Sequence, residues 1–230
     1  MKYAVISDVH SNLDALEAVI NEIPKTMPVL CLGDIVGYGP QPNEVIEAIQ
    51  SLKPLATLMG NHDYAVTTGD VEGFSDHAAA AIEWTRQHIT PANLHFISTL
   101  RSAVHFDVDN TQVALYHASP RDSLFEYVYP GISDREVKSL IELSKCRVIL
   151  LGHTHIPMRF SLESGLLANP GSVGQPRDGN PNASFGLLTI SGGECNFDYG
   201  RVEYDVDSTA AKISKAGLPS FLASRLYKGV

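Results

Sequence analysis

Several short apolar runs in this 230-residue chain end abruptly in a polar residue. The runs KYAVIS, MPVLCLG and PLATLMG are followed by Asp8, Asp34 and Asn61, and the later runs VALY and VILLG by His117 and His153. A polar or ionisable side chain beside a buried strand is unfavourable unless it finds a partner. The sequence therefore predicts a fold that brings these side chains together or gives them a common ligand.

The segments between the first three runs have helical spacing. Apolar residues recur three and four positions apart over 12–23 and 43–52, so the first third of the chain alternates strand and helix. Strand–helix–strand units of this length indicate right-handed crossovers and a mainly parallel sheet. We expect its strands over 2–7, 27–34 and 54–61.

The rest of the chain mixes helices with short strands separated by glycine and proline turns. Further helices are predicted over 75–89, from Pro91 onward, over 133–145 and over 208–226, and strands over 103–118, 147–153, 158–171 and 184–205. Capping signals are read at Ser11 with Asp14, at Thr90 with Pro91, and at Ser133 with Glu136. The pattern favours one α/β domain over 1–230, with two stacked sheets and helices outside.

Composition restricts the class of function. The net charge of −9 argues against non-specific binding to nucleic acid or anionic membranes, although it leaves open a nucleotide held by metal ions. Cys31, Cys146 and Cys195 form no CxxC pair, which favours reduced thiols. The N-terminus does not resemble a signal peptide and no apolar run reaches membrane-spanning length, so we expect a cytoplasmic protein. The sequence does not indicate an oligomeric state.

The polar residues at the strand ends are expected to meet in one crevice, because ligands bind at the carboxyl ends of parallel strands. Seven candidate ligands arrive there: Asp8, His10, Asp34, Asn61, His117, His153 and His155. Oxygen and imidazole ligands without thiolate suit Mn²⁺, Fe²⁺, Zn²⁺ or Ni²⁺. Seven ligands are too many for one such ion and suit two ions that share a carboxylate.

Each motif alone has an ordinary structural explanation. Asp8 with His10 could be a turn cap and a surface histidine, and Asp34 could close a strand-end turn. His153 and His155 are more specific, because two imidazoles at positions i and i+2 can bind one metal site. The complete set, in which each member follows an apolar run, favours metal binding.

The motifs DVH, GDIVGYGP, GNHD, HASP and GHTH, spread over residues 8 to 155, together resemble the calcineurin-like metallophosphoesterase superfamily. The later stretch NPGSVGQPRDG resembles the small prokaryotic phosphoesterases related to diadenosine tetraphosphatase. The resemblance implies a four-layer αββα sandwich of two mixed β-sheets flanked by helices. It also implies a phosphoesterase with two divalent metal ions, acting on a small phosphodiester or phosphomonoester, nucleotides included.

The resemblance further implies a role for each motif residue. One metal ion would be held by Asp8, His10, Asp34 and His155. The other would be held by Asp34, Asn61, His117 and His153, with Asp34 bridging the two. A hydroxide between the ions would attack the phosphorus. His62 would be the catalytic histidine that is not a ligand, and would contact the phosphate or protonate the leaving group.

Alternatives remain open at this point. GDIVGYGP lacks the GDxxDRG form of the Ser/Thr protein phosphatases, which argues against a protein substrate, whereas a dinucleoside polyphosphate remains possible. A non-catalytic, metal-bearing scaffold of the same fold is another interpretation, but such a scaffold would not need to retain His62. Asp63 could orient that imidazole or close its turn.

Candidate substrate contacts are less specific. Arg121 and Arg177 could bind phosphate oxygens, and Tyr38 could stack on a substrate, but surface ion pairs and packing are equally ordinary roles. We expect the loops 64–75 and 118–132 to determine specificity.

Overall fold

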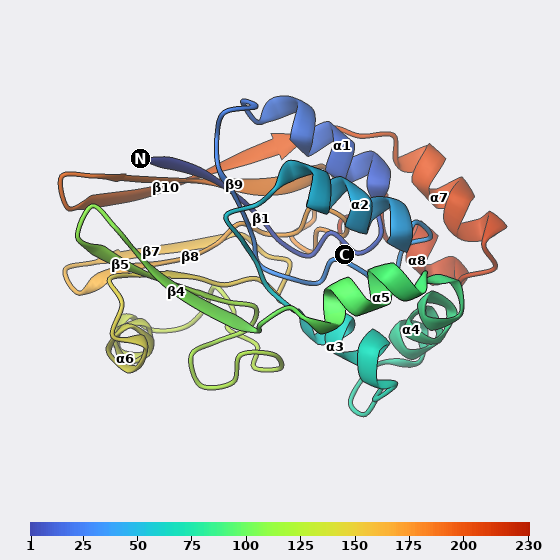
Figure 1. Ribbon diagram of the computed structural model, residues 1–230, viewed down its shortest axis with the longest axis horizontal. Coiled ribbons are helices and arrows are strands. Elements are labelled where there is room, and N and C mark those ends of the chain that lie inside the picture. The colour runs from blue at the N-terminus through green and yellow to red at the C-terminus, as the bar shows by residue number, and fades with distance from the viewer.

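The computed structural model describes all 230 residues and consists of two stacked five-stranded sheets with helices outside them (Figure 1). The first sheet has the order β10-β9-β1-β2-β3, with β1 Lys2–Ile6, β2 Val29–Cys31, β3 Ala56–Thr57, β9 Ala183–Ser191 and β10 Glu194–Val202. The second has the order β4-β5-β6-β8-β7, with β4 Ala103–Val108, β5 Thr111–Tyr116, β6 Val148–Leu150, β7 Met158–Leu162 and β8 Gly165–Asn169. The helices are α1 Leu13–Glu22, α2 Pro42–Leu52, α3 Asn61–Thr68, α4 Asp76–His88, α5 Pro91–Ser98, α6 Asp134–Ser144, α7 Val206–Lys215 and α8 Ser220–Ser224.

Both sheets are mixed. Strands β1, β2 and β3 run parallel, with Ala4 opposite Val29, and the long β9–β10 hairpin adds antiparallel to β1. Strands β5, β6 and β8 also run parallel, with β4 and β7 as antiparallel edges. The short connections after β1 and β2 therefore leave the first sheet at the same end, where the carboxyl ends of both strands lie.

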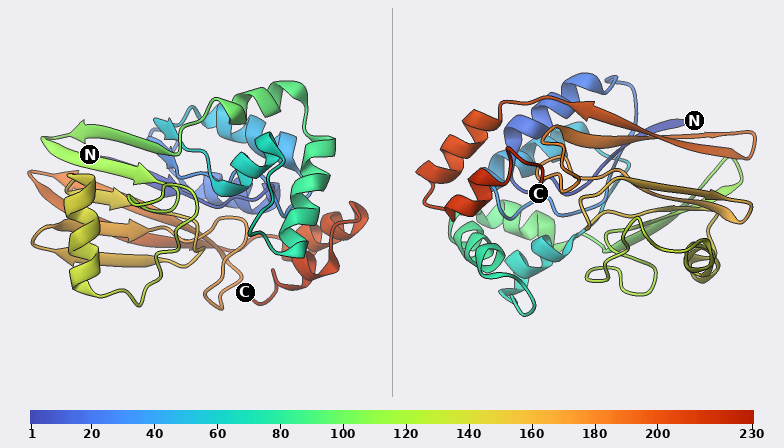
Figure 2. Two further views of the ribbon diagram at one scale, coloured as in Figure 1. Left: turned by 90° about the horizontal axis from the view of Figure 1, so that it is seen from below. Right: turned by 180° about the vertical axis from the view of Figure 1, so that it is seen from behind.

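The hydrophobic core lies in three layers of side chains. Between the sheets, Val5 and Leu30 of the first sheet pack with Leu115 and Leu150 of the second. Helices α1 and α2 cover the outer face of the first sheet, and α6 covers the outer face of the second (Figure 2). The predicted four-layer αββα sandwich is confirmed.

The remaining helices gather at one end of the sandwich. Helices α3, α4, α5, α7 and α8 lie at the end toward which β1 runs, whereas the strand hairpins extend at the other end (Figure 1). A small apolar cluster joins α4 to α7 and α8 there. None of the helices combines the length and the apolar character needed to cross a bilayer.

Two of the three predicted helix caps are confirmed. Thr90 and Ser133 accept hydrogen bonds from the backbone of their helices, as expected for N-caps. The capping box predicted at Ser11 is wrong, because Asn12 caps α1 by accepting a hydrogen bond from Ala15 at 3.1 Å. Ser11 instead has a left-handed backbone with φ of 54°.

Several observed strands are shorter than predicted, such as β2 Val29–Cys31 within 27–34 and β6 Val148–Leu150 within 147–153, and two predicted elements differ more. The helix predicted over 208–226 is divided into α7 and α8, because Gly217 takes a left-handed backbone and Pro219 follows it. The strand predicted over 54–61 is only two residues long, and Asn61 begins α3 instead.

The contact between the sheets can be tested at Leu115. The side chain is completely buried between them, so Leu115→Ala should lower the free energy of unfolding by about 2–5 kcal/mol, because the cavity cannot fully collapse. Leu143→Ala is the matched control, since Leu143 is 54% exposed. Urea unfolding of both variants measures the difference, and equal stability of the two would contradict this description of the core.

Candidate metal centre

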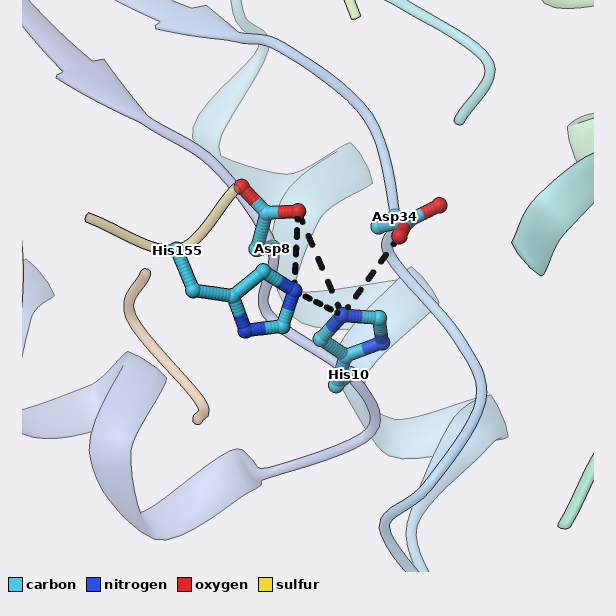
Figure 3. A group of neighbouring side chains, drawn as sticks. All are labelled: Asp8, His10, Asp34 and His155. Carbon is cyan, nitrogen blue, oxygen red and sulfur yellow. Dashed lines mark hydrogen bonds and ion pairs between the residues drawn. The ribbon is translucent and has the colours of Figure 1, made fainter. Parts of the chain in front are cut away.

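Two carboxylates and two imidazoles converge at the ends of β1, β2 and β6. The Nε2 atom of His155 lies 3.3 Å from Asp8 Oδ1, and the Nε2 atom of His10 lies 3.4 Å from Asp34 Oδ2 (Figure 3). The two Nε2 atoms are 3.1 Å apart. One potential ligand atom from each residue lies within 4.8 Å of the others, so the four can hold one metal ion.

The other nitrogen of each ring is anchored to the backbone. The Nδ1 atom of His10 donates to the Val36 carbonyl at 3.1 Å, and that of His155 donates to the Gln175 carbonyl at 2.6 Å. These bonds fix the tautomer in which Nε2 carries a lone pair. Two lone pairs that face each other repel unless a cation lies between them. Ligating histidines are oriented by this type of hydrogen bond.

A second group shares Asp34 with the first. It consists of Asp34, His117 and His153, whose potential ligand atoms also lie within 4.8 Å of one another. The Nδ1 atom of His117 donates to the Leu32 carbonyl at 2.8 Å, which directs Nε2 toward Asn61 Oδ1 at 3.1 Å and Asp34 Oδ1 at 3.5 Å. Three atoms with lone pairs thus face the same point, as in a cation site.

The backbone at these positions is strained. Asp8, His10, Asp34, His153 and His155 all have φ between 51° and 66°, the left-handed region that side chains with a β-carbon rarely adopt. Backbone hydrogen bonds hold the turns in place, among them one from Asp8 to Gly33 at 3.0 Å. The strain aims side chains from separate turns at one centre.

The electrostatics of the site also favour a bound cation. Burial raises the pKa of the Asp8 carboxyl to about 7, and burial also holds the pKa of Asp34 well above its usual range. Burial keeps the pKa values of His10 and His155 well below the usual range. Asp34 Oδ2 and His153 Nε2 have no hydrogen-bond partner, although both are buried. A divalent ion would relieve all of these penalties, so the donor set fits metal binding.

His62 lies beside this centre but is not aimed at it as a ligand. Its ring is 4.8 Å from that of His10 and 4.4 Å from that of Tyr38, centroid to centroid, and its buried Nδ1 has no partner. Burial, followed by the charge of Arg177, lowers the pKa of His62 well below its usual range. The ring is therefore neutral until a nearby anion stabilises its protonated form.

Asp63 has a structural role. Its carboxylate accepts hydrogen bonds from the backbone of Ile35 at 3.2 Å, of Val36 at 3.0 Å and of Gly60 at 2.9 Å. These bonds join the turn after β2 to the start of α3. Of the two roles considered from sequence, closing the turn is the one that the geometry supports, since no hydrogen bond links Asp63 to the imidazole of His62.

A pocket of about 460 Å³ opens beside the second group of ligands. Tyr38 and Arg177 line it, and the Arg177 guanidinium donates to the Tyr38 hydroxyl at 3.3 Å. The loops 64–75 and 118–132, which were predicted to determine specificity, supply Phe74 and Tyr127 to its lining. Arg121 does not line this pocket and forms an ion pair with Glu126 at 2.8 Å.

Two residues at the site were not found from the sequence. Gln175 joins the centre to the pocket, because its carbonyl orients His155 while its side chain accepts a hydrogen bond from Arg177 at 2.9 Å. Arg225 reaches the pocket from beyond α8. The glycine-rich stretch around Gln175 gave a weak signal, whereas nothing near Arg225 in the sequence indicates a site.

Gly60, just before α3, lies against Asp34 in the turn after β2, and this close approach can be tested by substitution. A β-carbon there would overlap Asp34 Oδ1 and the Asp34 backbone nitrogen, although the backbone of Gly60 itself is ordinary, with φ of −94°. We expect Gly60→Ala to displace the shared carboxylate and weaken Mn²⁺ binding by roughly 10–100-fold, the effect typical of residues that position a ligand. Calorimetric titration of metal-stripped protein measures this affinity.

Gly131→Ala is the control for that substitution, because a β-carbon at Gly131 meets no atom within 4 Å. It should bind Mn²⁺ like the wild type. Unchanged affinity in a folded Gly60→Ala protein would show that the position of the Asp34 carboxylate is not important for metal binding.

The sequence and the fold were compared with known proteins. A model of the calcineurin-like phosphoesterase superfamily domain matches residues 1–193. The chain is 39% identical over 245 aligned positions to the uncharacterized protein MJ0912 of Methanocaldococcus jannaschii, covering 98% of this chain and 97% of that protein.

Solved structures resemble the chain over its whole length. A metallophosphoesterase from Sphaerobacter thermophilus superposes with a TM-score of 0.85 at 33% identity, covering 100% of this chain and 99% of the other. The hypothetical protein PH1004 of Pyrococcus horikoshii has a TM-score of 0.91 at 21% identity, covering 100% and 98%. At 21% identity, the resemblance to PH1004 shows only that the two proteins share a fold.

Proposed function

The chain belongs to the calcineurin-like phosphoesterase superfamily, and on this premise we propose that it is a metal-dependent hydrolase of small phosphodiesters or phosphomonoesters, nucleotides included. The observation that carries the proposal is the pair of ligand groups that share Asp34. One carboxylate common to two groups is the arrangement of two-metal hydrolases. The adjoining pocket of about 460 Å³ has the size of a small-molecule site.

Two divalent ions complete the proposed centre. Asp8, His10 and His155 would hold one ion, Asn61, His117 and His153 would hold the other, and Asp34 would bridge them. When bound, such ions neutralise phosphate oxygens and lower the pKa of a water molecule between them. Mn²⁺, Fe²⁺, Zn²⁺ and Ni²⁺ all suit this set of nitrogen and oxygen ligands.

The residues around the centre would orient the substrate. Arg177 would bind a phosphate oxygen, and Tyr38 would support its guanidinium through their hydrogen bond at 3.3 Å. His62 would donate a proton from its ring to the departing oxygen. A phosphate anion beside His62 opposes the effect of burial on its pKa, so that substrate binding itself would favour the protonated acid.

The non-catalytic scaffold is the main rival proposal. The position of His62, whose ring lies 4.8 Å from that of His10 and lines the pocket, favours catalysis, because a scaffold has no need to retain an acid beside the metal ligands. The pocket of about 460 Å³, with Tyr38, Phe74 and Tyr127 in its lining, favours a small substrate, including a dinucleoside polyphosphate, over a folded protein surface.

Metal content tests the shared carboxylate. Elemental analysis and anomalous scattering should find two ions per chain at saturating Mn²⁺. Asp34→Asn should lower the metal content and the phosphoesterase activity together, because the bridge loses its charge. His153→Ala should mainly weaken one of the two sites. One ion per chain at saturation, or an Asp34→Asn protein with both ions and full turnover, would show that the bridging assignment is wrong.

The leaving group tests the role of His62. His62→Ala should retain both ions yet lose roughly 10²–10⁴-fold in kcat on alkyl phosphate esters, because an alkoxide needs a proton to depart. On p-nitrophenyl esters the loss should be smaller, since p-nitrophenolate leaves without one. Steady-state kinetics on both ester types, with metal content verified, gives the contrast.

The possible outcomes separate three roles for His62. An equal loss on both ester types would assign His62 to phosphate binding instead of acid catalysis. Lost metal and lowered thermal stability would assign it a structural role. Alkyl-ester turnover as fast as in the wild type would remove His62 from the mechanism and favour a scaffold.

A further inference from the structure

The C-terminal segment, residues 206–230, packs directly on the proposed active site. It contains α7, α8 and the turn that follows, all of which lie beyond residue 193, where the match to the superfamily model ends. Leu222 and Leu226 pack in one cluster with Tyr38, the residue between His10 and the pocket. The segment therefore forms part of the wall of the site.

Specific polar contacts hold this segment in place. Lys212 on α7 forms an ion pair with Asp14 on α1, with its Nζ 2.6 Å from Asp14 Oδ1. The backbone nitrogen of Gly179, in the loop that carries Arg177, donates to the Gly229 carbonyl at 2.9 Å. The chain end and the Arg177 loop are thus held together.

Arg225 and Arg177 come together on this wall. The guanidinium carbon of Arg177 is 5.7 Å from the centroid of the Tyr38 ring, and that of Arg225 is 5.9 Å from it. Both arginines line the same pocket of about 460 Å³. Neither forms an ion pair with an acidic side chain, although the exposed Glu72 also lines the pocket.

Two guanidinium groups in one pocket repel each other. Burial, followed by the charge of Arg177, lowers the pKa of Arg225 to about 10. The Nε of Arg225 donates to an oxygen of Val230, the last residue of the sequence, and the two terminal nitrogens of Arg225 have no hydrogen-bond partner. Two divalent ions would make the centre still more positive, so the arginines are not needed to neutralise Asp8 and Asp34. This charge arrangement fits an anionic ligand.

We propose that Arg225 and Arg177 form a second anion site beside the metal centre, which selects substrates that carry a further phosphate besides the one that is cleaved. Bidentate binding of phosphate is the interaction to which guanidinium geometry is best suited. Nucleoside diphosphates and triphosphates, and other compounds with a phosphoanhydride chain, belong to this class.

The relative positions of the two arginines assign them different parts of the ligand. The backbone nitrogen of Arg177 donates to the His155 carbonyl at 3.2 Å, and the Arg177 guanidinium donates to the side chain of Gln175, whose carbonyl orients His155, so Arg177 lies next to the metal ligands. Arg225 reaches the pocket from the C-terminal segment, just beyond α8. Arg177 would therefore contact the reacting phosphate, and Arg225 the more distant one. The selection of substrates rests on the proposed hydrolytic function, whereas the anion site does not.

Binding to metal-stripped protein tests the anion site without turnover. We expect calorimetric titration to show tighter binding of inorganic tripolyphosphate than of orthophosphate. Arg225→Gln should weaken tripolyphosphate binding by roughly 10–100-fold, as expected for losing charge-assisted hydrogen bonds, and orthophosphate binding by less than about 3-fold. Arg177→Gln should weaken both. Lys228→Gln, which removes a positive charge from an exposed position three residues away, is the matched control and should change neither.

Substrate selection is then measured with Mn²⁺-loaded protein. Arg225→Gln should lower kcat/KM for ADP by roughly 10–100-fold, mainly through KM, and lower that for p-nitrophenyl phosphate much less, because this ester carries no second phosphate. Thermal unfolding of each variant verifies the fold, and Arg225→Lys, which keeps the charge, should restore part of the loss on ADP.

The two proposals fail in different ways. If no phosphate ester is hydrolysed but tripolyphosphate binding still depends on Arg225, the hydrolase proposal is wrong and the anion site stands. If Arg225→Gln binds tripolyphosphate and turns over ADP like the Lys228→Gln control, the anion site is wrong and hydrolysis is unaffected. If citrate binds as tightly as tripolyphosphate with the same dependence on Arg225, the assignment to phosphate is wrong.

Discussion

The burial of carboxylates and imidazoles at adjoining strand ends is the constraint on which this site depends. Asp8 and Asp34 lie at most 1% exposed, and the fold supplies no cationic side chain that pairs with either. Burial raises the pKa of the Asp8 carboxyl to about 7, so the charged form of this carboxylate is destabilised unless a cation lies beside it. Metal binding is therefore coupled to the stability of this end of the sandwich.

The backbone of the turns after β1 and β2 places the candidate metal ligands next to one another. Left-handed residues and close turns are unfavourable alone, but the turns after β1 and β2 support each other through hydrogen bonds such as His10 to Asp34 at 3.0 Å. Asp63 connects the second turn to α3, which places His62 beside the centre. The strained turns directly follow strands of the two sheets, so the sheets fix the positions of the ligands.

The sequence predicted the parts of the site that lie in local patterns. Apolar runs followed by Asp or His located the strands and their carboxyl ends. The alternation of strand, helix and strand predicted the parallel arrangement that brings Asp8 near Asp34. Local patterns could not predict that Asn61 begins a helix, because the two-residue strand before it is set by pairing with β2. They could not locate Arg225 either, since its place is determined by apolar packing with Tyr38, far away in the chain.

The candidate metal ligands and the proposed anion site belong to structures of different kinds. Every candidate ligand lies at a strand end or at the start of α3, and three of the histidines are anchored to backbone carbonyls. Arg225 depends instead on two short helices held by the Lys212–Asp14 ion pair and a small apolar cluster. Short terminal elements open at lower free energy than core strands. The proposed selection of substrates therefore depends on a part of the fold that opens more easily than the strands that carry the metal ligands.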